Sequence, residues 1–211
     1  PVKNVSAIAA KFCIPIYTVD DWTNMVHASY ESSVTDTYAL MNDLDFTDYI
    51  ATNGWNYVDG YYAFAGKLFG QGHTIRGLVT TKGSFNTTQA LFSSLANGAE
   101  IRDLTIEFSN VPGDQNTLSL AGLAASVGSG CLISNCHVKA DWQGVYPDVY
   151  VSPAYKSCQY YGLAQTVSGV GIRIVDCTVE GKLAGGTSAY GFVGSATLNG
   201  GEIARCAVFA D

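Results

Sequence analysis

The sequence predicts an all-β fold, a right-handed parallel β-helix (a solenoid of about five coils) with a short N-terminal capping helix. Three observations predict it: a six-residue motif that occurs five times, a second motif that precedes it at nearly constant distance, and a composition suited to short strands. The 211 residues include 23 Gly and 13 Tyr, and only 14% are charged. This composition favours short strands joined by tight turns over long helices.

The recurring motif has its clearest copy at residues 133–138, Ile-Ser-Asn-Cys-His-Val. An apolar residue is followed, after a gap of two, by two apolar positions separated by one residue. Further copies begin at Ile75, Ile101, Ile174 and Ile203. Four of the five copies place Gly, Asp or Asn just before the second apolar position, and these residues tolerate the left-handed backbone of a sharp corner. Each copy therefore predicts a strand, a corner and a second strand.

The second motif is a Gly-Leu-like segment whose leading apolar residues are Leu91, Leu123, Leu163 and Phe192. Each precedes the next motif copy by 10, 10, 11 and 11 residues (91 to 101, 123 to 133, 163 to 174, 192 to 203). The full period varies more, at 26, 32, 41 and 29 residues (positions 75, 101, 133, 174 and 203). Two strands at fixed separation plus one loop of variable length are typical of a solenoid coil.

Equivalent motif positions should stack on one another in successive coils and form ladders of core residues. The expected ladder residues are Ile75, Ile101, Ile133, Ile174, Ile203, Cys136, Cys177 and Cys206. Stacked cysteines would lie within disulfide reach, but their parallel side chains have poor geometry for a bridge, so we expect buried free thiols.

Three further cysteines lie outside the motif, and a disulfide between two of them is an open alternative. They are Cys13, Cys131 and Cys158. The chain has no Cys-x-x-Cys spacing and no matching His pair, so we expect no zinc site and no other cofactor.

The domain boundaries follow from these patterns. Residues 1–17 form an apolar N-terminal arm, and residues 18–211 form the β-helix domain, with a capping helix at 18–29 and coils from 38 to 211. Thr18 is a suitable helix N-cap, because its hydroxyl can accept a hydrogen bond from a backbone N–H of the first turn. The acidic residues that follow it lie in the first turn, where the helix dipole favours negative charge.

The capping helix should cover the N-terminal end of the stack with an apolar face formed by Trp22, Met25 and Val26. No equivalent cap follows Val208, so we expect the C-terminal coil to continue beyond residue 211 or to be covered by a partner. Self-association of the arm with this open coil is one such possibility.

The charge and hydropathy exclude two classes of partner. The formal net charge is −7 and the isoelectric point is near 4.8, which disfavours nucleic acid. No apolar run approaches the roughly 20 residues that a membrane-spanning helix requires. We therefore expect neither nucleic-acid binding nor a membrane span.

Two segments carry a resemblance to a known family. Residues 38–46 (YALMNDLDF) and 64–78 (FAGKLFGQGHTIRGL), followed by the paired motifs, resemble the GLUG-repeat β-helices of bacterial surface and adhesin-like proteins. The resemblance covers most of the chain from about Thr18 onward. Ala124 and Gln165 depart from a uniform Gly-Leu-Val-Gly pattern. The resemblance implies a parallel β-helix with an extracellular or cell-surface location, and it implies a role only by analogy.

The long segment 137–161 is the expected binding region, because its many aromatics and few charges suit stacking on sugars or contact with a protein. The candidate binding residues are Trp142, Tyr146, Tyr150, Tyr155 and Tyr160. The alternative is that these aromatics fold back as a satellite core.

Catalysis receives less support from the sequence. Glu107 and Glu180 lie six residues after Ile101 and Ile174, and Lys139 holds the same place between them, which predicts a surface row of alternating charges. No lyase-type or polygalacturonase-type cluster is present, so we expect no enzyme.

The predicted function is an extracellular or cell-surface binding or structural module of an adhesin-like protein, which recognises a glycan or a protein. The alternatives are a subunit of a filament or a phage-type receptor-binding spike and, as a lesser one, a polysaccharide-degrading β-helix enzyme.

Overall fold

The computed structural model describes residues 13–28, 33–55, 58, 63–79, 88–96, 98–109, 117–143, 157–184 and 188–210. These residues are mostly strand, and they include two helices, α2 (Val19–Ala28) and α3 (Thr47–Asn53). Every strand pair among them is parallel. No described helix is long and apolar enough to cross a membrane.

The strands form three sheets. The 11-stranded sheet contains β1 (Ile14–Ile16), β2 (Thr37–Leu40), β3 (Leu44–Asp45), β4 (Lys67–Phe69), β5 (Thr74–Leu78), β8 (Glu100–Phe108), β11 (Leu132–Gln143), β14 (Arg173–Val175), β15 (Thr178–Ala184), β18 (Glu202–Ala204) and β19 (Ala207–Ala210). One four-stranded sheet contains β7 (Phe92–Leu95), β10 (Ala124–Val127), β13 (Ala164–Val170) and β17 (Val193–Asn199). The other contains β6 (Thr88–Gln89), β9 (Thr117–Ala121), β12 (Ser157–Tyr161) and β16 (Ser188–Tyr190).

The predicted right-handed parallel β-helix of about five coils is wrong. The strands lie in three separate parallel sheets of 11, 4 and 4 strands and do not form one regular solenoid. Among the described residues, the two small sheets begin at Thr88, whereas the large sheet already contains five strands before that residue. Among the earlier described residues, only isolated bridges at Val34 and Phe64 extend a small sheet. The layers are therefore unequal, which the recurring motifs did not reveal.

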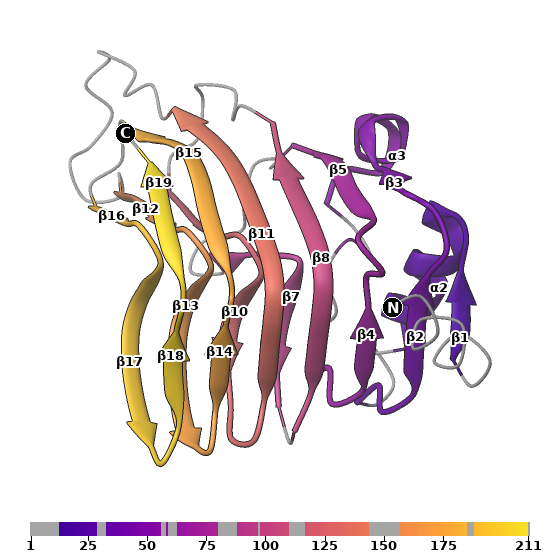
Figure 1. The fold of residues 1–211 in the computed structure, drawn as a ribbon. Coiled ribbons are helices and arrows are strands. Elements are labelled where there is room, and N and C mark those ends of the chain that lie inside the picture. Colours follow the sequence, from indigo (N-terminus) through magenta and orange to yellow (C-terminus); the bar gives the residue numbers. More distant parts are fainter. Residues whose placement is uncertain are drawn as a thin grey trace.

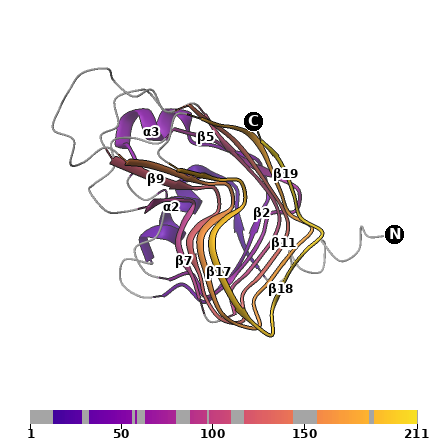
Figure 2. The same cartoon turned by 90° about the vertical axis from the view of Figure 1, so that its left-hand side faces the viewer.

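Figure 2 shows how the sheets are arranged. The large sheet bends and forms the outer layer, and the two small sheets lie inside the bend. The outer layer bends at corners where Asp103, Asn135 and Asp176 have left-handed backbone, with φ of 54°, 51° and 57°. These corner positions are those predicted from the motif. Arg205 occupies the next corner with φ 52°, although arginine has no intrinsic preference for this conformation.

The isoleucine ladder forms with one correction. Ile133 is in register with Ile101 and Ile174, and Ile203 pairs with Ile174. Ile75 does not belong to this ladder, because it pairs with Ile106 and Leu44, and Leu68 takes the place beside Ile101. The interval from 68 to 75 is two residues longer than that from 101 to 106 (7 against 5). The motif match at Ile75 was therefore out of register.

The motif cysteines are core residues, as predicted. The thiols of Cys136 and Cys177 are fully buried and lie 3.7 and 3.8 Å from the carbonyl oxygens of Ile101 and Ile133. Cys206 repeats this contact with Ile174 at 3.6 Å but is only half-buried, because β18 and β19, on either side of it, each pair with a single described strand.

The remaining cysteines do not show the disulfide that was left open. Neither Cys13 nor Cys131 forms a disulfide. The side chain of Cys158 lies outside the described residues.

Helix α2 lies at the N-terminal end of the sheets (Figure 1) and matches the predicted helix within one residue at each end. The Thr18 hydroxyl accepts a hydrogen bond from the Asp21 N–H (3.2 Å), and the Asp21 carboxylate accepts one from the Thr18 N–H (3.0 Å). This reciprocal cap fixes the first turn. The Trp22 ring is buried between Phe46 and Phe92, with ring centroids 6.4 and 5.8 Å away.

Two local features were not anticipated from the sequence. Residues Ile14–Ile16 of the predicted arm 1–17 form β1, which pairs in parallel with β2 (Ile14 with Tyr38), and residues 1–12 lie outside the described residues. The other is α3, in which Ile50 is the buried residue.

Candidate functional site

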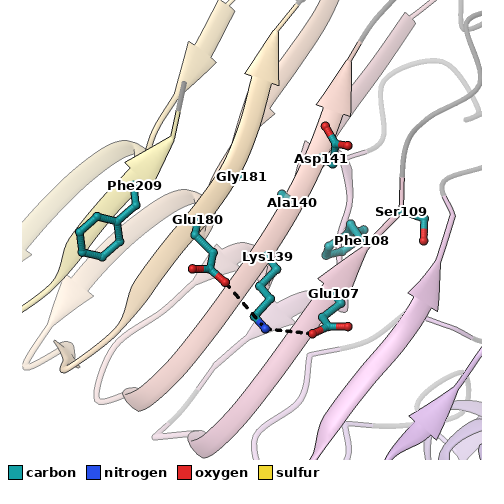
Figure 3. Close-up of a pocket in the computed structure, with 9 residues that line it drawn as sticks. All are labelled: Glu107, Phe108, Ser109, Lys139, Ala140, Asp141, Glu180, Gly181 and Phe209. Atoms are coloured by element: carbon teal, nitrogen blue, oxygen red, sulfur yellow. Dashed lines mark ion pairs between the residues drawn. The ribbon is translucent and has the colours of Figure 1, made fainter.

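An open groove of about 580 Å³ crosses the outer face of the large sheet, over strands β8, β11, β15 and β19 (Figure 3). Its wall consists of carboxylates, one lysine, small residues and two phenylalanines. The lining residues are Glu107, Phe108, Ser109, Lys139, Ala140, Asp141, Glu180, Gly181 and Phe209.

The centre of the groove is a row of alternating charges on three adjacent strands. Lys139 is in register with Glu107 on one side and Glu180 on the other. Its Nζ lies 3.1 Å from the Glu107 carboxylate and 3.8 Å from that of Glu180, as the dashed lines in Figure 3 mark. The hydrogen bond to Glu107 raises the pKa of Lys139, so the amine stays protonated. This confirms the predicted surface row of charges.

The row continues towards the N-terminal end through Arg76 and Asp45. Arg76 Nε donates to the Asp45 carboxylate at 2.9 Å, and the negative charge of Glu107 also raises the pKa of Arg76. The pKa of Asp45 falls to about 2, first because it accepts a hydrogen bond from the Thr47 hydroxyl and then because it accepts one from Arg76. Exposed ion pairs of this kind contribute about 0–1 kcal/mol each, so the row orients side chains more than it stabilises the fold.

The alternation stops at the last strand. The residue beside Glu180 on β19 is Phe209, and its side chain is 67% exposed. Glu180 therefore has a charged neighbour on one side and an aromatic ring on the other. The charged groups that line the groove are three carboxylates, including Asp141, and one amine, so their sum is −3 + 1 = −2. This net charge disfavours phosphate, sulfate and carboxylate ligands.

The structure corrects the predicted aromatic binding site. Trp142 and Tyr160 are 0% and 1% exposed, and their ring centroids lie 5.8 Å apart. Trp142 also packs edge-on against Phe108 at 5.2 Å. These two residues therefore belong to the core, in agreement with the alternative that the aromatics of this segment pack as a satellite core. The other three candidates, Tyr146, Tyr150 and Tyr155, lie outside the described residues.

Phe209 is the most exposed large apolar residue among the groove residues that sequence reasoning missed. It follows Ile203 by six residues, the same offset that places Glu107 after Ile101 and Glu180 after Ile174. The signal was thus present in the motif, although an aromatic residue broke the pattern of charges.

The aspartates with shifted pKa values do not suit acid–base catalysis. The pKa values of Asp43, Asp45 and Asp176 are all lowered, whereas a general acid needs a raised pKa. Asp43 accepts a hydrogen bond from the Thr74 N–H and contacts His73, whereas Asp45 contacts Thr47. Both carboxylates pair with the Arg76 guanidinium, at 3.8 Å for Asp43 and 2.9 Å for Asp45, so a cation holds both in the ionised form. No group of three or more potential metal ligands occurs among the described residues.

No family model, curated protein or solved structure matches this chain. The resemblance to GLUG-repeat proteins therefore stays a prediction, and the functional argument depends on the groove itself.

Proposed function

We propose that this chain is a glycan-binding module of an adhesin-like protein at a cell surface or in the extracellular space, and that the groove binds a neutral glycan. The observation that carries the proposal is the exposed Phe209 ring beside the Glu180–Lys139–Glu107 row. Carboxylates and amines exchange hydrogen bonds with sugar hydroxyls, and an aromatic ring packs against the apolar face of a pyranose.

The charge of the groove limits the class of glycan. With a lining charge of −2, a uronate or a sulfated sugar would meet net repulsion, whereas a neutral sugar brings no charge that must be desolvated. A lysine-rich or arginine-rich protein segment also satisfies this electrostatic condition. The Phe209 ring offers a flat apolar surface to a pyranose face. A cationic side chain also stacks on an aromatic ring, so the binding measurements below have to distinguish a glycan from a basic peptide.

The scaffold supports binding without rearrangement. Lys139 lies on β11, which pairs with β8 on one side and with β15 on the other. The backbone under Glu107, Lys139 and Glu180 is therefore fixed by hydrogen bonds before any ligand arrives. Such preorganisation reduces the entropy lost on binding.

The direct test is binding of neutral and acidic oligosaccharides, measured on a glycan array and then by calorimetry. We expect neutral glycans to bind and uronate-containing or sulfated glycans to bind more weakly. Phe209→Ala and Glu180→Gln should each weaken binding about tenfold, which corresponds to about 1.4 kcal/mol. Both side chains are exposed, so the melting temperature should change little.

The matched control is Glu202→Gln, which neutralises an exposed carboxylate on β18 that pairs with Arg173 (2.9 Å) outside the groove. This variant should bind like the unmodified protein. Equal weakening by Glu202→Gln, or a preference for acidic glycans, would contradict the proposal. Binding of a basic peptide that depends on Glu180 but not on Phe209 would point to a protein ligand instead.

A further inference from the structure

A second row of side chains lies beside the row of charges on the outer face of the large sheet. Its residues are polar, uncharged and partly exposed, and they are in register with one another across β5, β8, β11 and β15. They are Thr74, Thr105, His137 and Thr178. We call these four residues the neutral row, and we call Arg76, Glu107, Lys139 and Glu180 the charged row.

The two rows face the same side of the sheet. Each residue of the neutral row precedes a residue of the charged row by two positions. Side chains two residues apart on a strand share a face and lie about 6.6 Å apart along the strand. The residues between the rows point the other way, and Ile106, Val138 and Val179 are accordingly fully buried. The outer face therefore presents two parallel lines of polar groups above a packed core.

The neutral row supplies hydrogen-bonding groups without charge. His137 Nδ1 lies 2.8 Å from Thr178 Oγ1, so the imidazole ring and the hydroxyl orient each other. Within the described part of the chain this contact uses Nδ1, and Nε2 remains for a ligand. Hydroxyl and neutral imidazole groups can both donate and accept hydrogen bonds, which suits a ligand that carries many hydroxyls.

The array of the two rows is long across the strands and narrow along them. On one side it is bounded by the corners at Asp103, Asn135 and Asp176, which lie two residues before the neutral row. Across the strands, the charged row runs from β5 to β15, and the Phe209 ring follows on β19. At about 4.8 Å per strand, these five positions span roughly 19 Å. A ligand that contacts all of them must be elongated and must lie across the strands, along the line of Glu180, Lys139 and Glu107 in Figure 3.

We propose that the ligand of this face is a linear neutral polysaccharide that lies across the strands, with one sugar unit on each strand. The proposal rests on the glycan binding proposed above, and it adds the neutral row and Arg76 to the binding residues. Neighbouring strands lie about 4.8 Å apart, which is close to the advance of one pyranose unit in an extended chain. Each unit carries hydroxyls on both edges, so one edge meets the neutral row and the other meets the charged row.

An extended peptide does not match this spacing. Side chains on one face of a peptide strand repeat about every 6.6 Å, so they lose register with strands about 4.8 Å apart within a few residues. A glycan with one unit per strand repeats the same contacts at each position. Because Arg76 and the residues beside it extend the array beyond the groove, each added sugar unit gains further hydrogen bonds.

The first test is the dependence of affinity on glycan length. Calorimetry of the full chain with linear β-1,4-linked oligomers of glucose, mannose and xylose, from dimer to pentamer, measures it. Each added unit should tighten binding about threefold, which corresponds to about 0.7 kcal/mol, or one further hydrogen bond. The pentamer should therefore bind about 30-fold more tightly than the dimer.

The second test is the variant Arg76→Gln, which separates an extended site from a local one. Arg76 lies on β5, four strands from Phe209 on β19. A dimer placed against Phe209 does not reach Arg76, so the variant should weaken binding of the pentamer about tenfold and leave binding of the dimer unchanged. Phe209→Ala should weaken both. A purely structural effect of Arg76→Gln would change both lengths alike.

The matched control is Arg173→Gln. Arg173 and Arg76 are both about half exposed, and each donates from Nε to a carboxylate at 2.9 Å. Arg173 lies on β14, on the other side of the Asp176 corner, so this variant should bind every oligomer like the unmodified protein. Equal affinity for dimer and pentamer, or equal weakening of both by Arg76→Gln, would overturn the extended site and leave the proposed glycan binding intact. Failure of every oligomer to bind would overturn both proposals.

Discussion

Replacing Trp142 with alanine should destabilise the fold without removing a ligand contact. The side chain is completely buried and packs between Phe108 and Tyr160, at ring-centroid distances of 5.2 and 5.8 Å. Truncation of a buried tryptophan costs about 3–5 kcal/mol, from lost transfer energy and from the cavity that remains. Because a domain has only about 5–15 kcal/mol of stability, the variant should lose a large part of its total.

Trp142→Phe refines this prediction. The indole Nε1 is buried and has no hydrogen-bond partner in the described part of the chain. An unsatisfied buried donor costs about 1–3 kcal/mol of desolvation, and the phenylalanine variant removes this cost. The gain opposes the stability lost with the smaller ring. The phenylalanine variant should therefore lose clearly less stability than the alanine variant.

Urea denaturation followed by circular dichroism measures both variants, with Tyr17→Ala as the control. Tyr17 is half exposed and should cost less than about 1 kcal/mol. The reasoning would be refuted if Trp142→Ala unfolded at the same urea concentration as the unmodified chain while glycan binding was lost. That result would place Trp142 in a binding site and not in the core.

Two further predictions concern acid stability and thiol reactivity. The pKa of Asp45 is lowered to about 2, so its contribution to stability is complete above the unfolded pKa near 3.9 and is lost as the pH falls towards 2. Asp45→Asn should therefore make the melting temperature less dependent on pH between about 4 and 2, and an unchanged slope would contradict this. The hydrogen bond with the Cys177 thiol, and then burial, raise the pKa of Cys136, and burial raises the pKa of Cys206. Only Cys206 is partly exposed, so a thiol reagent followed by mass spectrometry should label Cys206 well before Cys136. Equal rates would mean that the last strands open readily.

Corner chemistry is local and was therefore predictable. Asp103, Asn135 and Asp176 tolerate left-handed backbone by themselves, and each adopts it. Arg205 adopts the same conformation because of tertiary context, since β18 and β19 on either side of it pair with β14 and β15, the strands on either side of Asp176. The predicted register of Ile75 was wrong because it also depends on distant pairing. A two-residue extension between Leu68 and Ile75 leaves the apolar pattern intact but shifts the pairing.

The number of layers could not be predicted from the local motifs. The motif describes how one strand turns into the next, but it does not say whether each earlier segment also supplies a strand to an inner sheet. Residues before Thr88 supply five strands to the large sheet, and among the described residues they supply only isolated bridges to the inner layer. Sheet closure depends on such distant pairings, so the solenoid prediction exceeded what the repeats could support.

The groove and the buried tryptophan have the same origin in the alternation of β11. Val138, Ala140 and Trp142 point inward and are buried, whereas Lys139 and Asp141 point outward into the groove. The binding prediction failed because it treated the residues after His137 as a loop, although the strand continues to Gln143.

The residue at position 209 determines where the row of alternating charges on the outer face ends. A basic residue at position 209 would pair with Glu180 and would extend the charge row to the last strand. Phenylalanine at this position leaves Glu180 with only Lys139 as a charged partner, at 3.8 Å, and sets an exposed ring beside it. An exposed aromatic side chain adds little to the stability of an edge strand, whereas a polar ligand with one apolar face can use the ring and the carboxylate together. The place where the row of charges is interrupted is thus the place where recognition is expected.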